Sequence, residues 1–470
     1  MPLQNKIFNR MRNHFYFKKF HDAFLLTNDT GAHIFLSDQE FKWFLSDPTK
    51  LPSQTQEILT EHQFLLQNID QATDCMRLKK AALFHGPSLF IFVVTENCNF
   101  NCVYCQASSP HALHAQSMTK EIAWKAVDIA LSSPETLLTF EFQGGEPLLN
   151  FPIIKEIVFY AESRKRTKQI QYALVSNLTL LNKEMISFFR NYHFQISTSL
   201  DGPKWLQILN RPSRKSPNSW DGTLKGVQAL RKEGIPVGAI LTTTRQAFNH
   251  EEEIIQAYIN NGFTSIFIRP LTPLGEASIK WNEIGYTPEE YCTFYTRCLS
   301  AIELHNTENS SHIEEVFNTL LCSSISGDSE IRYTELGSPC GGGTGQMAFM
   351  YNGKVYTCDE GRMLGETGND LFQMGTVNNI YKELITSSAC KAVCSSSILE
   401  AIPECCSCVY QPYCGVCPVV NMALYDELIA PQAHGYHCTI NKRILDDIFT
   451  RIYNRSLGKG LQKENEVEED

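Results

Sequence analysis

Cys98-Asn-Phe-Asn-Cys102-Val-Tyr-Cys105 is the stretch that decides the fold, and it comes directly after the apolar run 89–94. Three thiolates at this spacing can hold three irons of a [4Fe-4S] cube, because such clusters select soft ligands. The fourth iron then has no protein ligand and is open to a small molecule. Structural zinc is the alternative, but zinc sites usually close with four ligands in two separated pairs. The stretch therefore favours an open iron-sulfur cluster at the C-terminal end of a predicted strand.

The composition is that of an ordinary globular protein, and 470 residues are enough for two or three domains. A net charge of -10 argues against nucleic acid as the main partner, since phosphate binding needs a basic surface. Residues 1–20 contain no continuous apolar stretch of the kind that a secretory signal needs. No run approaches the ~20 apolar residues of a membrane span. We expect a cytoplasmic protein that binds neither nucleic acid nor membrane.

Residues 86–275 alternate between strand and helix patterns, which predicts an α/β fold with parallel strands and right-handed crossovers. Each helical stretch has one apolar face, as in 120–131. In barrels built this way, chemistry is located at the C-terminal ends of the strands. The six predicted strands are 89–95, 138–142, 172–175, 194–199, 237–242 and 265–268.

Polar motifs follow several of these strands. Gly144-Gly145-Glu146-Pro147 comes after the second, where paired glycines let the backbone approach a ligand and Glu146 offers an acceptor. After the fourth strand, Arg211 suits a carboxylate because its fork binds both oxygens, whereas Asp201 can serve the strand turn. Arg269, after the sixth, either enters the barrel mouth or pairs on its wall.

The cysteine triplet, with the aromatic Tyr104 before its last member and Gly-Gly-Glu-Pro one βα unit later, resembles the radical S-adenosylmethionine (SAM) enzymes. The resemblance implies a partial (β/α)6 barrel and a [4Fe-4S] cluster, held by Cys98, Cys102 and Cys105, that binds SAM. It also implies that the Gly-Gly-Glu-Pro segment receives the SAM amino group. The cofactor-binding residues that it implies are Gly144, Gly145, Glu146, Pro147, Ser176, Asn177, Ser199 and Arg211.

The segments on either side of the barrel have patterns of their own. Residues 1–85 form a predicted α+β module, with a hairpin turn at 28–31, a helix capped by Ser37 and a second helix over 54–66. This module is either a packing cap or a peptide-recognition element, resembling the winged leader-binding elements that use strand addition. Residues 276–335 are a predicted helical linker with a capping box at Thr287, and 446–470 are a predicted helix end and acidic tail.

Seventeen cysteines in a chain without an export signal indicate metal ligands rather than disulfides, and ten of them lie after residue 339. Residues 336–445 resemble the SPASM domain, which carries two auxiliary iron-sulfur clusters. A zinc ribbon is the alternative. By resemblance, Cys340, Cys358 and Cys417 hold the first auxiliary cluster. Its fourth iron is either open or bound by a further ligand. That ligand is a residue other than cysteine or one of the spare cysteines Cys390, Cys394 and Cys406. The implied ligands of the second are Cys405, Cys408, Cys414 and Cys438.

Asp359 follows Cys358 immediately, and the matching Asp of the sulfatase-maturing relatives takes a proton during substrate oxidation. We expect the same catalytic role here, with capping of the cluster loop as the alternative. Three phrases, 140–150, 357–363 and 409–418, resemble the His-Xaa-Ser system radical SAM maturases over nearly the whole chain.

That family resemblance implies a precursor peptide with His-Xaa-Ser repeats, a second radical SAM enzyme of the same system and a reducing electron donor. The implied reaction is hydrogen abstraction by a 5′-deoxyadenosyl radical followed by net oxidation, with a cross-link as the expected product. Two alternatives remain: a maturase that oxidises Cys or Ser to formylglycine, and a metal-stabilised binding scaffold without turnover.

Overall fold

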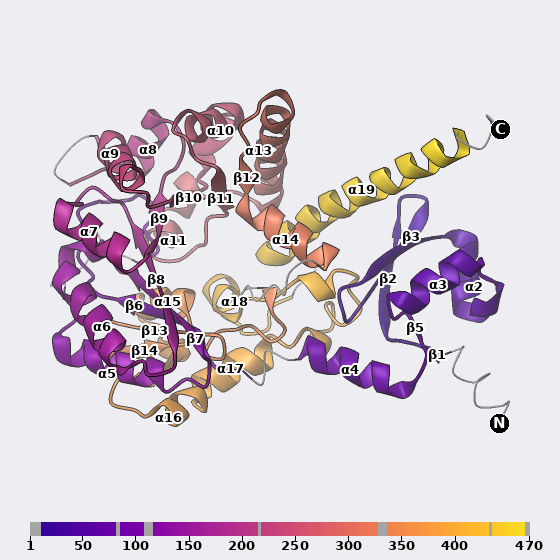
Figure 1. Ribbon diagram of the computed structural model, residues 1–470, viewed down its shortest axis with the longest axis horizontal. Coiled ribbons are helices and arrows are strands. Elements are labelled where there is room, and N and C mark those ends of the chain that lie inside the picture. Colours follow the sequence, from indigo (N-terminus) through magenta and orange to yellow (C-terminus); the bar gives the residue numbers. More distant parts are fainter. Residues whose placement is uncertain are drawn as a thin grey trace.

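The computed structural model describes residues 11–80, 85–107, 116–214, 218–327, 336–431 and 435–465. The start of the predicted N-terminal module, the end of the predicted linker and the last residues of the predicted tail lie outside these ranges. Figure 1 shows a large lobe that contains the barrel and a smaller lobe formed by the N-terminal residues. The long helix α19 (Tyr436–Asn465) extends from the large lobe along the smaller one.

Six parallel strands, each paired with its neighbours in sequence order, form a partial (β/α)6 barrel in an α/β fold. All six predicted strands are confirmed, with ends that shift by at most three residues and with no shift for 237–242. The strands are β6 (Leu89–Val93), β7 (Leu137–Gln143), β8 (Gln169–Ser176), β9 (Gln195–Ser199), β10 (Val237–Thr242) and β11 (Ser265–Arg269).

Alternation along these strands decides which side chains enter the barrel. In β7, Leu138, Phe140 and Phe142 are fully buried. Glu141 and Gln143, at the alternate positions of the strand, are half-buried and face the barrel cavity. The apolar set packs against the outer helices, because successive side chains of a strand point to opposite faces. The same two-residue period brings polar residues of the later strands to the cavity.

Helices between the strands cover the outside of the barrel (Figure 1). α5 (Lys120–Leu131) starts where Thr119 accepts a hydrogen bond from the backbone N–H of Ile122, and its buried face packs beside α6 (Phe151–Arg164). The capping box at Thr287 is confirmed at the start of α13 (Pro288–Glu308). Further helices are α7 (Lys183–Asn191), α8 (Lys204–Asn210), α9 (Ser219–Lys232), α10 (Glu251–Asn260), α11 (Glu276–Ile279), α12 (Trp281–Ile284) and α14 (Val316–Ser326).

The barrel sheet continues into the cysteine-rich region. β13 (Gln346–Phe349) pairs in parallel with β6, and β14 (Lys354–Tyr356) and β15 (Gln373–Thr376) extend the sheet beyond it. At the opposite edge, the short β12 (Glu314–Glu315) pairs with β11. The division of the chain into domains stays a prediction. The sequence analysis did not predict that β6 of the barrel pairs with β13 of the cysteine-rich region. Helices of this region are α15 (Asp359–Glu366), α16 (Tyr381–Ile385), α17 (Ser388–Ser396) and α18 (Pro418–Tyr425).

The N-terminal residues form a three-stranded antiparallel sheet with its own apolar core. The hairpin turn at 28–31 and the capping box at Ser37 are confirmed. The predicted helix over 54–66 is wrong at its end: α3 stops at Glu61, and Gln63 adopts a positive φ that breaks the helix. Elements of this lobe are β1 (Met11–Arg12), β2 (Phe15–Phe20), β3 (Ala23–Asn28), β4 (His33–Ser37), α2 (Asp38–Ser46), α3 (Ser53–Glu61), β5 (Leu65–Leu66) and α4 (Ile69–Lys79).

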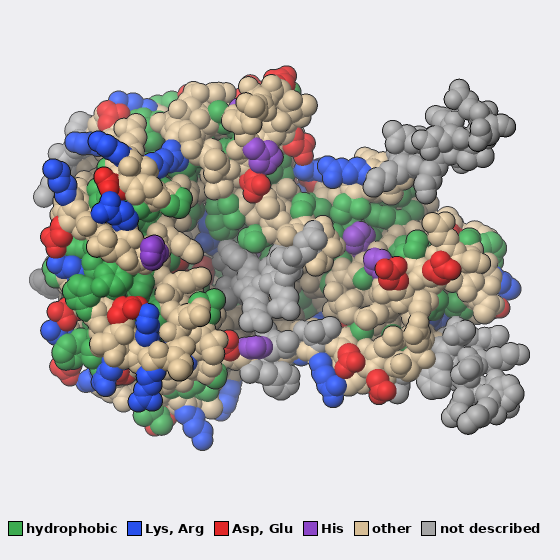
Figure 2. Space-filling view, viewed as in Figure 1, with side chains coloured by type: hydrophobic (Ala, Val, Ile, Leu, Met, Phe, Trp, Pro, Cys, Tyr) green, Lys and Arg blue, Asp and Glu red, His purple; other side chains and the backbone are tan. Residues whose placement is uncertain are grey.

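This small lobe is joined to the cysteine-rich region by buried polar contacts. The Thr27 hydroxyl donates to the Val409 carbonyl at 2.6 Å, and the Tyr413 hydroxyl donates to the Gly31 carbonyl at 2.7 Å. Figure 2 shows acidic and basic side chains intermixed over the visible face. Within the described ranges, no helix combines the length and apolar character that crossing a membrane requires.

Candidate active site

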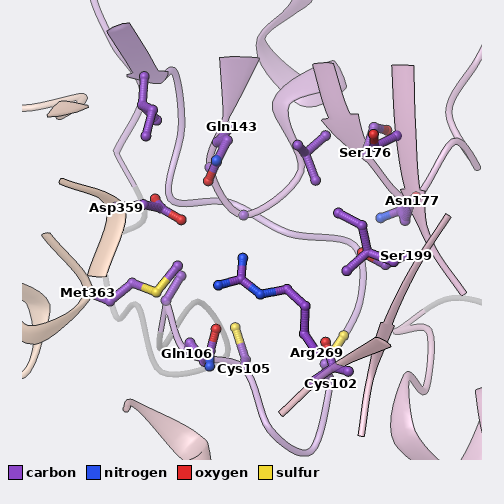
Figure 3. Close-up of a pocket in the computed structure, with 18 of the residues that line it drawn as sticks. Cys102, Cys105, Gln106, Gln143, Ser176, Asn177, Ser199, Arg269, Asp359 and Met363 are labelled. Atoms are coloured by element: carbon purple, nitrogen blue, oxygen red, sulfur yellow. The ribbon is translucent and has the colours of Figure 1, made fainter. Parts of the chain in front are cut away.

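A cavity of about 420 Å³ opens at the C-terminal ends of the barrel strands. Its size falls within the ~300–1,000 Å³ of small-molecule sites. Figure 3 shows Cys102 and Cys105 along one side, Ser176, Asn177 and Ser199 on strand ends, and Asp359 and Met363 on the segment that faces them. All three cysteines of the triplet line the cavity.

The cysteine loop, residues 98–105, is fixed by backbone hydrogen bonds to the end of α8 and the start of α11. The N–H of Val103 donates to the Asn210 carbonyl at 2.8 Å, and the N–H of Glu276 donates to the Cys105 carbonyl at 2.9 Å. The Phe100 N–H points at the Cys98 sulfur from 3.4 Å. Three thiols on so short a loop are therefore held in one place.

Gly144 and Gly145 lie against the backbone just before this loop. A side-chain Cβ at Gly144 would come within 2.3 Å of the Thr95 carbonyl oxygen, and one at Gly145 would come equally close to the Asn97 carbonyl oxygen. The N–H groups of Gly145 and Glu146 donate to these same two carbonyls at 2.9 and 2.8 Å. The paired glycines thus allow the end of β7 to pack against the backbone just before the cysteine triplet. The sequence did not reveal this reason for two glycines at these positions.

The Glu146 side chain is completely buried and braces the end of β8. Its carboxylate accepts the Ser176 hydroxyl at 2.7 Å, and the N–H groups of Asn177 and Leu148 at 2.9 and 3.1 Å. Burial raises the pKa of Glu146 to about 7, against the effect of these donors. Pro147 starts the turn after it. A carboxyl of this kind changes its charge near neutral pH.

Arg211 stands between the cysteine loop and β9. Its Nε lies 3.1 Å from an Asp201 carboxylate oxygen, its guanidinium lies 5.0 Å from the Tyr104 ring centre, and the Tyr104 hydroxyl donates to Asp201 at 2.6 Å. The Thr242 N–H also donates to Asp201, which places Asp201 in the strand turn, as one sequence interpretation has it. Ser199 lines the cavity nearby.

The wall opposite the barrel comes from the cysteine-rich region. Cys358 caps α15, its sulfur accepting the Gly361 N–H at 3.2 Å, and the first turn of α15 brings Asp359, Glu360 and Arg362 to the cavity. Arg269 also lines the cavity and lies 3.8 Å from Glu360, so it both faces the mouth and pairs across it. Gln143, Glu141 and Arg362 were missed by the sequence analysis. Gln143 directly precedes Gly144, and Arg362 is three residues after Asp359 on one helix.

Comparison with known proteins decides the class. Residues 92–268 match the family model of the radical SAM superfamily. These residues, which include the barrel strands β7 to β10 and most of β11, form a radical SAM domain. The domain and the similarity to sulfatase-maturating enzymes indicate an oxidoreductase-type radical SAM enzyme, and a radical SAM domain implies a [4Fe-4S] cluster and SAM as cofactors.

Similarity to known proteins extends beyond the radical SAM domain. An uncharacterized protein of Methanocaldococcus jannaschii is 32% identical over 40% of this chain, and that match spans 64% of its own length. A cysteine-type anaerobic sulfatase-maturating enzyme of Clostridium perfringens is 24% identical over 78% of this chain and 97% of its own length. The structure of anSMEcpe with bound AdoMet covers 79% of this chain and 99% of that chain at 20% identity and a TM-score of 0.66. The structure of Streptococcus suis SuiB bound to the precursor peptide SuiA covers 91% of this chain and 100% of that chain, at 13% identity and a TM-score of 0.56.

The residues of the triplet fit the cluster that this superfamily implies. Burial raises the pKa of Cys98 to about 12 and also raises that of Cys102, so these thiols stay protonated without a strong cation beside them. Iron supplies such a charge and takes deprotonated thiols as ligands. In the described part of the chain, no three His, Cys, Asp or Glu side chains converge as ligands of a single ion do. Thiolates on separate irons of a cube need no such convergence.

The auxiliary cysteines separate into two groups in space. Cys340 and Cys358 are buried in one apolar cluster with Cys417 packed at its border. The other group is Cys405, Cys408, Cys414 and Cys438. Burial, and to a smaller extent the neighbouring cysteines of this group, raise the pKa of Cys405 to about 12. Cys390 and Cys394 share a face of α17, and the exposed Cys406 donates to the Pro403 carbonyl. The two ligand sets that the SPASM resemblance implies stay predictions.

Proposed function

We propose that this protein is a radical SAM maturase that oxidises a ribosomally made precursor peptide, with a His-Xaa-Ser repeat peptide as the expected substrate and a cross-link as the expected product. The observation that carries the proposal is the composition of one cavity. It contains the open cysteine triplet, the Gly144–Glu146 strand end and, from the cysteine-rich region, Asp359.

In this proposal, Cys98, Cys102 and Cys105 hold the SAM-binding cluster, and the residues at the ends of β7, β8 and β9 hold SAM. When bound, the cluster and SAM supply a radical for hydrogen abstraction, and the two auxiliary clusters supply an electron acceptor. Asp359 takes up the proton that the substrate loses, because its carboxylate faces the cavity and is 19% exposed. The buried strand ends keep water from the cavity floor.

Peptide recognition is assigned to the N-terminal lobe. Its antiparallel sheet has β2 and β4 as edge strands, and a leader peptide adds to such an edge through main-chain hydrogen bonds. SuiB, which shares the fold, binds a precursor peptide. A second radical SAM enzyme, a reducing donor and a cytoplasmic location remain predictions from the family resemblance.

A sulfatase-maturase-like oxidation of Cys or Ser to formylglycine is the second candidate. It is favoured by similarity to sulfatase-maturating enzymes over more than three quarters of the chain. The two candidates predict different products, since a formylglycine aldehyde hydrates and a cross-link does not.

The test is anaerobic incubation of the reconstituted enzyme with SAM, dithionite and either a synthetic His-Xaa-Ser repeat peptide or a peptide with one internal Cys. Mass spectrometry then follows the peptide and 5′-deoxyadenosine. A loss of two hydrogens from the repeat peptide without hydration is expected, and Asp359→Asn should lower product formation by roughly 10²-fold. Exclusive reaction of the Cys peptide would establish the second candidate instead. If neither peptide changes while 5′-deoxyadenosine forms, both substrate assignments are wrong.

A further inference from the structure

Among the residues that the structure describes, Arg362 is the largest completely buried side chain, with 1% exposure, and it lies between the cysteine-rich region and the barrel. It belongs to α15, the helix that Cys358 caps. Its Nε donates to Asp359 Oδ1 at 2.8 Å, and its Nη2 donates to Gln143 Oε1 at 3.2 Å. One guanidinium therefore touches both walls of the cavity.

The third contact is looser. Arg362 Nη1 lies 3.6 Å from Glu366 Oε2, and within the described residues neither atom has a hydrogen-bond partner. A buried ion pair of this kind contributes little net stability, because removing both charges from water offsets their attraction. A well-packed apolar residue would suit the same space at less cost. The arginine is therefore better explained by what its fork holds than by the stability it adds.

Gln143 is the last residue of β7, directly before Gly144 and Gly145. Its side chain is itself oriented, since Gln143 Nε2 donates to the Glu141 carboxylate on the same strand. The path Asp359–Arg362–Gln143 thus joins the proposed proton acceptor to the strand end that is proposed to receive SAM. The bond at Gln143 spans more than two hundred positions of the chain.

We propose that Arg362 is a positioning residue that fixes the Asp359 carboxylate relative to the Gly144–Glu146 strand end. Hydrogen abstraction and proton removal must act on one substrate group, so the two walls have to keep a constant separation. The planar fork does this because Nε and Nη2 hold their two partners in fixed directions. The inference deepens the proposed function and rests on it for the role of Asp359.

The first experiment needs no peptide. Hydrogen exchange followed by mass spectrometry is measured on the reconstituted enzyme with and without SAM, for peptides that cover 143–150 and 359–366. In the wild type, SAM should slow exchange in both segments, since the Gln143–Arg362 bond connects them. In Arg362→Gln, SAM should still slow 143–150 but no longer 359–366. Gln143→Leu cuts the same connection from the barrel side, leaves the Arg362–Asp359 pair intact and should give the same result.

Arg190→Gln is the matched control, because Arg190 on α7 forms an exposed ion pair at 2.7 Å with Glu233, the residue that ends α9. It should behave as the wild type. Persistent slowing of 359–366 by SAM in both Arg362→Gln and Gln143→Leu would overturn the inference. If Arg362→Gln does not fold, the Gln143→Leu result decides alone.

The second experiment uses the peptide that the wild type modifies, and measures modified peptide formed per 5′-deoxyadenosine. Loss of positioning should lower this ratio by roughly 10²-fold in Arg362→Gln, with partial recovery in Arg362→Lys. An unchanged ratio would contradict the inference. If the wild type modifies no peptide, the proposed function fails, while the exchange experiment still tests the connection.

Discussion

The two walls of the cavity are built by different means. The barrel wall is a dense set of backbone contacts, in which Gly145 and Glu146 bond directly to the carbonyls of Thr95 and Asn97. The opposite wall is one helix turn, and the contact between the two walls at the strand end runs through the side chain of Arg362. Backbone contacts do not depend on the side chains of the residues that make them, whereas a side-chain bridge depends on a single residue.

This difference suggests a division of roles. A wall of backbone contacts suits a cofactor that is the same in every member of a superfamily, because backbone geometry changes little with sequence. A wall held by side chains can be altered by few substitutions, which suits a substrate that differs between enzymes. Substitutions in the barrel wall test this difference by comparison with Arg362.

Replacement of Cys102 by Ala should have the largest effect. It leaves a cube with two thiolate ligands, so the reconstituted variant should form no 5′-deoxyadenosine above background in an anaerobic assay with SAM and dithionite. Cys322→Ala is the control, since Cys322 lies on α14, outside all three sets of proposed cysteine ligands. Wild-type production by Cys102→Ala would remove the basis of the proposed cluster site.

Gly145→Ala tests the close approach of backbones. Its Cβ would stand 2.3 Å from the Asn97 carbonyl oxygen, so the strand end must move off the backbone just before the cysteine triplet. We expect destabilisation of roughly 1–3 kcal/mol from overpacking, together with weaker SAM binding by equilibrium dialysis. Gly238→Ala in β10 is the matched control, because its Cβ would meet the nearest atom at 3.4 Å, an ordinary contact. Equal behaviour of the two variants would show that the close approach is unimportant.

The affinity for SAM should fall below neutral pH. Glu146 has a pKa of about 7, raised by burial, and only its carboxylate form attracts the SAM ammonium group. The ammonium keeps its proton in this range, since α-amino groups have a pKa near ~8. Each pH unit below 7 should therefore weaken binding by up to about tenfold. Equilibrium dialysis between pH 6 and 8 measures this, and Glu146→Gln should bind weakly with no acid-side dependence. A wild-type affinity that stays constant over this range would contradict the assignment.

The barrel and its floor were predictable from the sequence because their signals are local. A triplet within eight residues, a Gly-Gly-Glu-Pro segment and six alternating strands each report a structure through short spacings or a fixed period. The close approach at Gly144 and Gly145 was predicted as contact with a ligand, whereas the structure shows contact with residues 95–97. The sequence indicates that glycine is needed at these positions, but it does not identify the neighbouring atom that leaves no room for a side chain.

The opposite wall was only partly predictable. Asp359 was found through its place beside Cys358, but Arg362 and Gln143 lie far apart in the chain and meet only through the fold. Pairing of β13 with β6, which brings the two regions together, gives no local signal, since a parallel pair can join distant segments. The helix predicted over 54–66 failed for a related reason: Leu65–Leu66 pairs with β1 instead of extending α3.

Redundancy within the barrel wall can be tested at the buried Asp201. Tyr104→Phe removes one of the three groups that contact the buried Asp201, leaving Arg211 and the Thr242 N–H in place. We expect a loss of about 1.5–3 kcal/mol in the free energy of unfolding, the usual contribution of a hydrogen bond to a charged group. Tyr160→Phe removes an exposed bond to Asp128 and should cost less than ~0.5 kcal/mol. Urea unfolding of the reconstituted proteins compares the two. A larger loss than expected at Tyr104 would mean that the barrel wall also depends on single side chains, and the contrast with Arg362 would disappear.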